Sequence, residues 1–270
     1  MLNFNRLALL SCLLLFNFAA YCQLGFSHEI GVIAGPTQFR SDFGSRNEEE
    51  TNIGNSGIGI GIVHYISFAY SADCNCYTTD TYFNDHFKLR SEISWNKTNL
   101  DHHGFWVAPD KTGIESDKLR AHSGVAENFD IGMQLEYFPL SIRSFQAFAY
   151  RIAPFVSFGV HYTSFNPKAK TTYGTGDIFN PNDIYFGWTQ NYVPGVTEYP
   201  INIDGGSTWS VVSSIGARYK LGVLSDLMLD LRWQYYFSDW IDGLDHNWQN
   251  YDRKNDWLIW LNVGYIYYLD

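Results

Sequence analysis

The sequence is poor in cysteine, has no long apolar segment beyond its start, and contains few basic residues. Two of its four cysteines, Cys12 and Cys22, lie near the N-terminus, so only Cys74 and Cys76 remain, too few for a disulfide framework. No run of 18 apolar residues follows residue 23, and we therefore expect no spanning helix. The balance of 18 basic to 28 acidic residues gives a net charge of −10 and disfavours nucleic acid as a partner.

The N-terminal segment has the features of an export signal. Arg6 supplies a positive charge, residues 7–18 are mostly apolar, and Ala20 and Cys22 are small residues at the positions that a signal peptidase requires. The apolar run of about 12 residues is shorter than the roughly 20 that a spanning helix needs. We therefore expect residues 1–22 to be removed.

The remaining residues 23–270 are expected to form one domain. A lipid anchor on Cys22 is disfavoured because the bulky Tyr21 precedes it. Loss of Arg6 leaves 17 basic and 28 acidic residues, a net charge of −11.

Residues 87–97 show the pattern that recurs through the chain. Phe87, Leu89 and Trp95 alternate with Lys88 and Arg90, a period of two that places the two sets on opposite faces of a β-strand. Eight segments follow this pattern: residues 26–35, 57–68, 87–97, 128–138, 147–163, 209–221, 226–237 and 257–269. Pro36 is expected to end the first of them.

Alternating segments without a spanning helix favour an all-β, eight-stranded, antiparallel up-and-down transmembrane β-barrel, with the apolar face toward lipid. The alternative is a soluble exported β-sandwich or barrel. An aromatic content of 18% favours the membrane protein, because Tyr and Trp collect at bilayer interfaces. Connections alternate between long and short, as expected for long external loops and short periplasmic turns. The link 70–84 is an unexplained exception.

These features resemble the small outer-membrane barrels of Gram-negative bacteria, the OmpA-like and PorT-like group, and more specifically those of Bacteroidota. The resemblance rests on the signal ending at Gln23, the eight segments and the aromatic final segment 257–270, which ends on Asp270 rather than on an aromatic residue. It implies an outer-membrane location with lipid as surroundings. It does not imply an activity, because the group includes structural, adhesive, secretion-accessory and a few enzymatic barrels.

Charged residues occupy the inward face of the predicted strands. The predicted lumen network consists of Glu29, Lys88, Arg90, Glu92, Asp130, Glu136, Arg151, Arg218, Lys220, Asp230 and Arg232. In a lumen only wide enough for side chains these groups should pair and close the pore, because an unpaired buried charge is costly. The alternative is a narrow small-solute channel in which the pairs exchange partners.

Three further groups invite functional hypotheses. Cys74 and Cys76 are compatible with a local disulfide or idle thiols, with a bond to another protein, or with redox or metal chemistry. The histidines His102, His103, His122 and His246 lie near Asp101 and Asp245 in predicted loops, which raises the alternative of an outer-membrane hydrolase. Without a Gly-x-Ser-x-Gly motif we favour a non-enzymatic protein with no cofactor and no metal. His28, His64 and His161 are expected at the rim or in the lumen.

The longest predicted loop, residues 164–207, is rich in aromatic residues among Asn and Gly. Tyr185, Trp188 and Tyr192 could contact an envelope protein or a glycan, because rigid aromatics beside small polar residues form adaptable binding surfaces. Alternatively, these rings pack the loop onto itself. The function that the sequence favours is a closed barrel with a structural, adhesive or secretion-accessory role through its loops and periplasmic rim.

Overall fold

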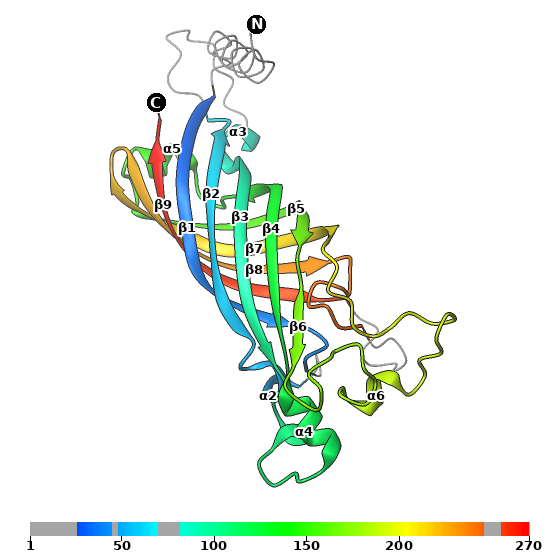
Figure 1. Ribbon diagram of the computed structural model, residues 1–270. Coiled ribbons are helices and arrows are strands. Elements are labelled where there is room, and N and C mark those ends of the chain that lie inside the picture. Colours follow the sequence, from blue (N-terminus) through cyan, green and yellow to red (C-terminus); the bar gives the residue numbers. More distant parts are fainter. Residues whose placement is uncertain (1–25, 45–47, 70–81, 246–254, 270) are drawn as a thin grey trace, which may run out of the picture.

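The computed structural model describes residues 26–44, 48–69, 82–245 and 255–269, and its strands form a closed antiparallel β-barrel (Figure 1). This confirms the predicted fold. The strands are β1 (Ser27–Arg40), β2 (Ser56–Ser67), β3 (Phe87–Asp101), β4 (His122–Tyr137), β5 (Ile152–Phe165), β6 (Lys168–Thr171), β7 (Gly206–Gly222), β8 (Ser225–Tyr236) and β9 (Trp257–Tyr268).

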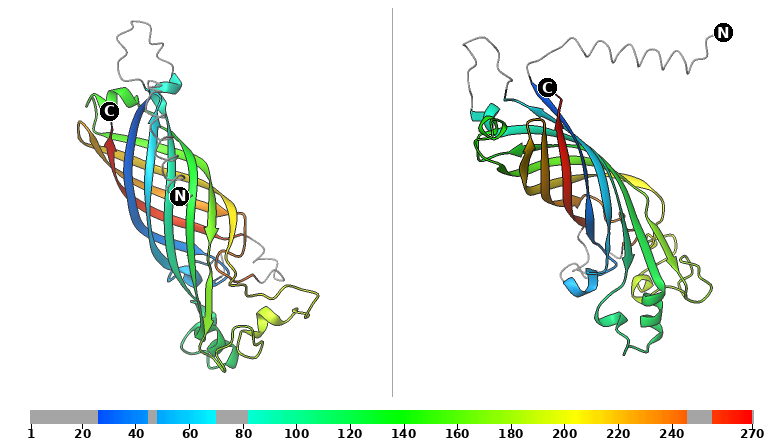
Figure 2. Two further views of the ribbon diagram at one scale, coloured as in Figure 1. Left: turned by 45° about the horizontal axis from the view of Figure 1, so that its top comes forward. Right: turned by 90° about the vertical axis from the view of Figure 1, so that its left-hand side faces the viewer.

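Each long strand pairs with the next one in the chain, and β1 closes the barrel by pairing with β9. The short β6 does not add a ninth strand to the barrel wall. It pairs with the first residues of β4, directly beyond the part of β4 that pairs with β5, so β5 and β6 act as one interrupted strand. The barrel is therefore eight-stranded, and its strands are tilted relative to the barrel axis (Figure 2).

The two ends of the barrel differ. The start of β1 and the end of β9 lie at one end, here called the terminal end, because Glu29 pairs with Tyr268. The opposite end, called the loop end, carries the longest connections (Figure 1). The short helices are α2 (Glu49–Asn52), α3 (Tyr82–His86), η1 (Phe105–Val107), α4 (Ile114–Ala121), α5 (Ile142–Gln146) and α6 (Phe186–Thr189). In the described ranges, none of these helices has the length and apolar composition to cross a bilayer.

The outer wall is apolar over most of its height. On β2 alone Ile58, Ile60 and Ile62 are 52–61% exposed, and comparable side chains continue over the neighbouring strands, such as Ile93 and Phe129. A surface of this extent would promote aggregation in water. It is the lipid-facing belt of a membrane barrel, and the predicted outward parity is confirmed on every strand.

Several predicted boundaries are wrong. Pro36 does not end β1, which continues to Arg40. Pro36 keeps its register with Ile58 of β2, and only the ladder to β9 is interrupted beside it, because proline lacks an N–H donor. The polar loop expected between the predicted segments 87–97 and 128–138, over residues 99–124, is also shorter than predicted. Its two ends extend β3 and β4, and its middle forms η1 and α4.

The unexplained link 70–84 ends in structure at the terminal end. Residues 70–81 lie outside the described ranges, whereas α3 occupies the residues before β3. The Asp85 carboxylate accepts a hydrogen bond from the Arg143 backbone N–H at 3.0 Å, and the His86 ring lies 2.7 Å from the Phe138 carbonyl. This helix therefore covers part of the barrel end beside α5.

Candidate functional site

Five buried cations and their carboxylates fill the middle and the terminal half of the lumen. Nearest the terminal end, Lys220 pairs with Asp226 at 3.1 Å. Glu29 then pairs with both Lys88 and Arg218, the latter at 2.6 Å. These side chains are at most 1% exposed. The charged residues on the inward faces of the strands thus form a set of ion pairs that crosses the lumen.

Arg90 and Arg218 link this set to the middle of the lumen. Arg218 donates to Glu136 at 3.1 Å, and Arg90 donates to Asp230 at 2.9 Å. Arg90 also lies 3.4 Å from Glu136, so both arginines share that carboxylate. Sharing of charges in this way offsets the desolvation that isolated buried ions would suffer.

Glu92 and Arg232 form the most regular pair. Both carboxylate oxygens of Glu92 accept from Arg232 at 2.6 Å, and one of them also lies 2.8 Å from Arg90. Planar, two-bond contacts of this kind fix geometry as well as charge. The middle of the lumen is therefore rigidly cross-linked.

Asp130 differs from the other lumen carboxylates because its hydrogen-bond donors are neutral. Thr163 and Gln234 donate to one of its oxygens at 2.5 and 2.8 Å, and Asn96 donates to the other at 3.2 Å. The structure places it in the lumen, as predicted from its parity, in a polar layer between the ion pairs and the loop end.

Arg151 is a correction to the predicted network. It lies one residue before β5 and is exposed, so its side chain does not enter the lumen. Only its backbone joins the wall, where its carbonyl accepts from the Lys220 N–H at 2.9 Å. The network also contains Asp226, which the prediction omitted. Asp226 shares the inward parity of Met228 and Asp230 and is the cross-strand neighbour of Lys220. That parity was visible in the sequence.

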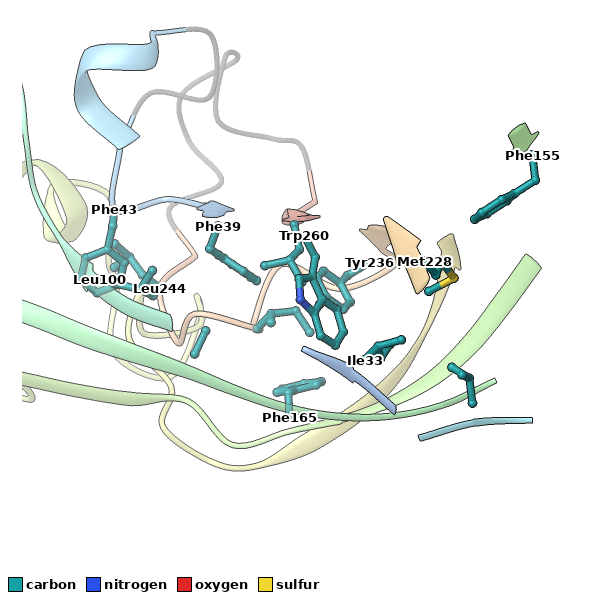
Figure 3. Packing of buried hydrophobic residues seen from close by; sticks show 14 of the residues in the cluster. Ile33, Phe39, Phe43, Leu100, Phe155, Phe165, Met228, Tyr236, Leu244 and Trp260 are labelled. Atoms are coloured by element: carbon teal, nitrogen blue, oxygen red, sulfur yellow. The ribbon is translucent and has the colours of Figure 1, made fainter. Parts of the chain in front are cut away.

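Apolar side chains cover the polar layers at both ends. Phe138, Ile142 and Phe145 are 1–2% exposed at the terminal end. Toward the loop end, Phe39 packs against Tyr236 with ring centroids 5.9 Å apart, and Trp260 belongs to the same buried cluster (Figure 3); all three are fully buried. The paired and packed side chains therefore fill the lumen and leave no open passage among the residues that the structure describes.

An aromatic junction, defined here as Phe43, His102, His122 and Trp188, joins three loops at the loop end. The Phe43 ring stacks on His102 and His122 with centroids 4.8 and 5.1 Å away. Trp188 contacts the same two histidines at 5.3 and 4.9 Å. Because these residues come from the β1–β2 connection, the ends of β3 and β4, and the α6 segment, the junction holds those connections together.

The junction is expected to weaken in acid. Burial lowers the pKa of His122 from 6.5 to about 4, and His102 Nε2 lies 3.1 Å from His122 Nδ1, where two protonated rings would repel. The neutral ring therefore stabilises the docked α6 segment above pH 6.5. That stability, about 3 kcal/mol, is lost as the pH falls from about 6.5 to about 4. Limited proteolysis of residues 172–205 across this range measures the loss.

The variant His122→Phe is the control for this pH dependence. It keeps a ring in the junction and removes the group that titrates, so proteolysis should become independent of pH between 4 and 6.5. An unchanged profile in the variant would assign the acid sensitivity to another group.

The predicted partner residues of the long loop are mostly turned inward. Trp188 is only 5% exposed, and the Tyr185 ring packs edge-on against it with the centroids 5.6 Å apart, so Trp188 is buried within the loop rather than available to a partner. Tyr192 packs against Tyr199 at 5.1 Å, and Tyr199 donates to the Ile178 carbonyl at 2.9 Å. The rings of this loop mainly pack it onto itself.

Exposed aromatic residues also lie on a lobe at the loop end formed by η1, α4 and the residues between them, here called the η1–α4 lobe, in addition to Phe179 and Phe186 of the long loop. Phe105, Trp106 and Ile114 are 61–65% exposed. Arg120 holds the lobe together by donating to the carbonyls of Val107 at 3.1 Å, of Ala108 at 2.9 Å, and of Lys111. This surface was not predicted, because its segment has the composition of a polar loop.

Among the described loop histidines, His122 lacks the carboxylate partner that a hydrolase would use to activate it. His122 contacts His102, and the downward shift of its pKa has burial as its one cause, with no carboxylate acting on it. His246 lies outside the described residues, as do Cys74 and Cys76 and the predicted signal.

One acidic cluster lies at the loop end. Asp42, Asp239 and Asp245 place carboxylate oxygens within 4.8 Å of one another. Oxygen ligands of this kind suit Ca²⁺. Acidic clusters are also common without an ion, and we assign no metal to this one.

A closed barrel with a lipid-facing belt and a charge-paired interior defines an outer-membrane β-barrel protein. No family model matches the chain, and no curated protein sequence matches it. Among solved structures, the chain is similar to Neisserial surface protein A (TM-score 0.44, 11% identity, 89% of this chain and 96% of that chain). It is also similar to a major outer membrane protein of Thermus thermophilus (TM-score 0.44, 13% identity, 90% and 99%).

A third similar structure is Ail, the attachment invasion locus protein of Yersinia pestis, solved with the heparin analogue sucrose octasulfate (TM-score 0.41, 8% identity, 91% of this chain and 100% of that chain).

Proposed function

We propose that this protein is a non-conducting, non-enzymatic barrel of the outer membrane that displays the η1–α4 lobe outside the cell and binds a protein partner through it. The resemblance to PorT-like barrels of Bacteroidota and the removal of residues 1–22 belong to the same proposal. The loop end faces outward in it, as in barrels whose termini lie in the periplasm.

The observation that carries the proposal is the contrast between the lumen and the lobe. The lumen is closed by charge pairs such as Glu92 with Arg232, so it leaves little room for a solute. The lobe is internally braced by Arg120, yet leaves Trp106 65% exposed. Rigid exposed aromatics are the usual anchors of protein interfaces.

A protein fits this surface better than a glycan does. Phe105 and Ile114 offer apolar contact area and no hydrogen-bonding side chain of their own, which suits the buried core of a protein interface. The contact of Lys111 Nζ with the Phe105 ring, 3.8 Å from its centroid, adds a cation at the rim of the patch.

The test compares surface-displayed protein with the double variant Phe105→Ser/Trp106→Ser in a heterologous Gram-negative host. Binding of cells to immobilised secreted and envelope proteins, and to a glycan array, should show protein targets that the variant loses by at least about tenfold, as expected for hot-spot residues. Val223→Ser is the control, because Val223 is 74% exposed at the terminal end.

Two outcomes would contradict the proposal. Binding that the double variant retains would remove the lobe from recognition, and binding confined to glycans would replace the protein partner. A planar-bilayer recording tests the channel alternative. A channel would give discrete current steps, whereas our proposal predicts none.

A further inference from the structure

A cluster of lysines lies on the outer wall of the barrel, directly beyond the lipid-facing belt. Trp95 and Phe129 are cross-strand neighbours in the last apolar row of β3 and β4. The next outward pair toward the loop end is Lys97 with Glu127. Apolar side chains thus give way to charged ones within one step of the strands, which is where lipid headgroups begin.

The lysines come from β3 and β6, the two strands that flank β4. Lys168 and Lys170 of β6 pair with Val125 and Ser123 of β4, the outward residues that follow Glu127. Lys168, with a side chain 57% exposed, contacts Glu127 at 3.1 Å, and Trp95 Nε1 donates to the other oxygen of Glu127 at 3.3 Å. Glu127 therefore fixes Lys168 directly above the belt.

The other two lysines also place positive charge on this face. Lys97 and Lys170 are exposed and form no ion pair within the ranges that the structure describes. Besides Glu127, the neighbouring carboxylate on this face is Asp101, which pairs with Ser123 one strand away from Lys170. The three lysines exceed the two carboxylates in a chain whose net charge is −10.

The rest of the rim carries no comparable cluster in the described ranges. At the same end the outward positions hold aromatic residues such as Tyr162, Trp209 and Trp257. The outward Arg40 lies over the Trp257 ring and 3.8 Å from Glu49. Positive charge is therefore concentrated on one side of the barrel.

We propose that Lys97, Lys168 and Lys170 bind the phosphate groups of an anionic lipid in the leaflet at the loop end, with its acyl chains against Trp95 and Phe129. Ammonium groups at headgroup height attract phosphate, and the belt below supplies apolar contact for the same molecule. A bound lipid of this kind would form part of the wall beneath the η1–α4 lobe.

The experiment uses the purified full-length protein in phosphatidylcholine nanodiscs that contain a trace of spin-labelled phosphatidic acid. The wild-type protein should enrich the probe at its surface by about tenfold over spin-labelled phosphatidylcholine. The triple variant Lys97→Gln/Lys168→Gln/Lys170→Gln should abolish most of this preference. Arg151→Gln, which removes an exposed cation at the opposite end, should leave it unchanged.

Folding of each variant is checked by the shift in electrophoretic mobility on heating. Equal enrichment in the wild-type protein and the triple variant would overturn the proposal. Inorganic phosphate is the competing probe: if it displaces the lipid as effectively as unlabelled phosphatidic acid does, the patch recognises free phosphate and the lipid assignment is wrong.

Discussion

Replacing Glu92 by glutamine is expected to lower the free energy of unfolding by about 3–5 kcal/mol, because Arg232 then stays buried without a carboxylate. Glu92 is the one ion-pair partner of Arg232 in the described part of the chain. Urea-induced unfolding in detergent micelles, followed by tryptophan fluorescence, measures the change.

Two comparisons isolate this effect. Glu49→Gln removes a carboxylate that is 71% exposed and 3.8 Å from Arg40, so it should cost less than about 1 kcal/mol. The double variant Glu92→Leu/Arg232→Leu should regain much of the loss, because it removes both ions of this pair. Arg90, which also contacts Glu92, keeps Asp230 as its partner. A double variant as unstable as Glu92→Gln would show that packing, rather than charge, dominates.

The second large effect is expected at Trp260. Its ring is fully buried and fills the space opposite Gly59, where an added Cβ would come within 2.5 Å of the indole. Trp260→Ala should lower the free energy of unfolding by about 3–5 kcal/mol, because the cavity it leaves is only partly refilled. The guanidinium of Arg232, 4.8 Å from the ring centroid, loses its aromatic neighbour as well.

The matched control is Trp106→Ala on the η1–α4 lobe. Its ring is 65% exposed, so its loss should change the free energy of unfolding by no more than about 0.5 kcal/mol. The same urea titration serves both variants. If Trp260→Ala lowered the free energy of unfolding as little as Trp106→Ala does, the side chains around Trp260 would have to move and fill the cavity.

The strands and the direction of their side chains were predictable because a period of two is a local property. Once Lys88 and Arg90 are assigned to the inner face, a closed barrel forces them to meet carboxylates from other strands. Which carboxylate each one meets depends on the stagger of the strands, and the sequence does not specify it. Glu29 accordingly meets both Lys88 and Arg218.

Features outside the alternating segments were harder to predict. Arg151 has the inward parity but lies before the first residue of β5, and parity has no meaning where the strand has not begun. The long loop contains rings that could pack inward or face a partner, and only the junction with His102 and His122 decides this for Trp188.

The extension of β4 beyond the belt has a mechanical consequence. From Glu127 to His122 the strand continues for five steps, roughly 17 Å at the usual rise per residue, while paired to β3 and, through its first four residues, to β6. A hydrogen-bonded ribbon of this length is a stiff stalk. It holds the η1–α4 lobe away from the lipid-facing belt, so a force applied to the lobe is transmitted along the paired strands to the barrel wall.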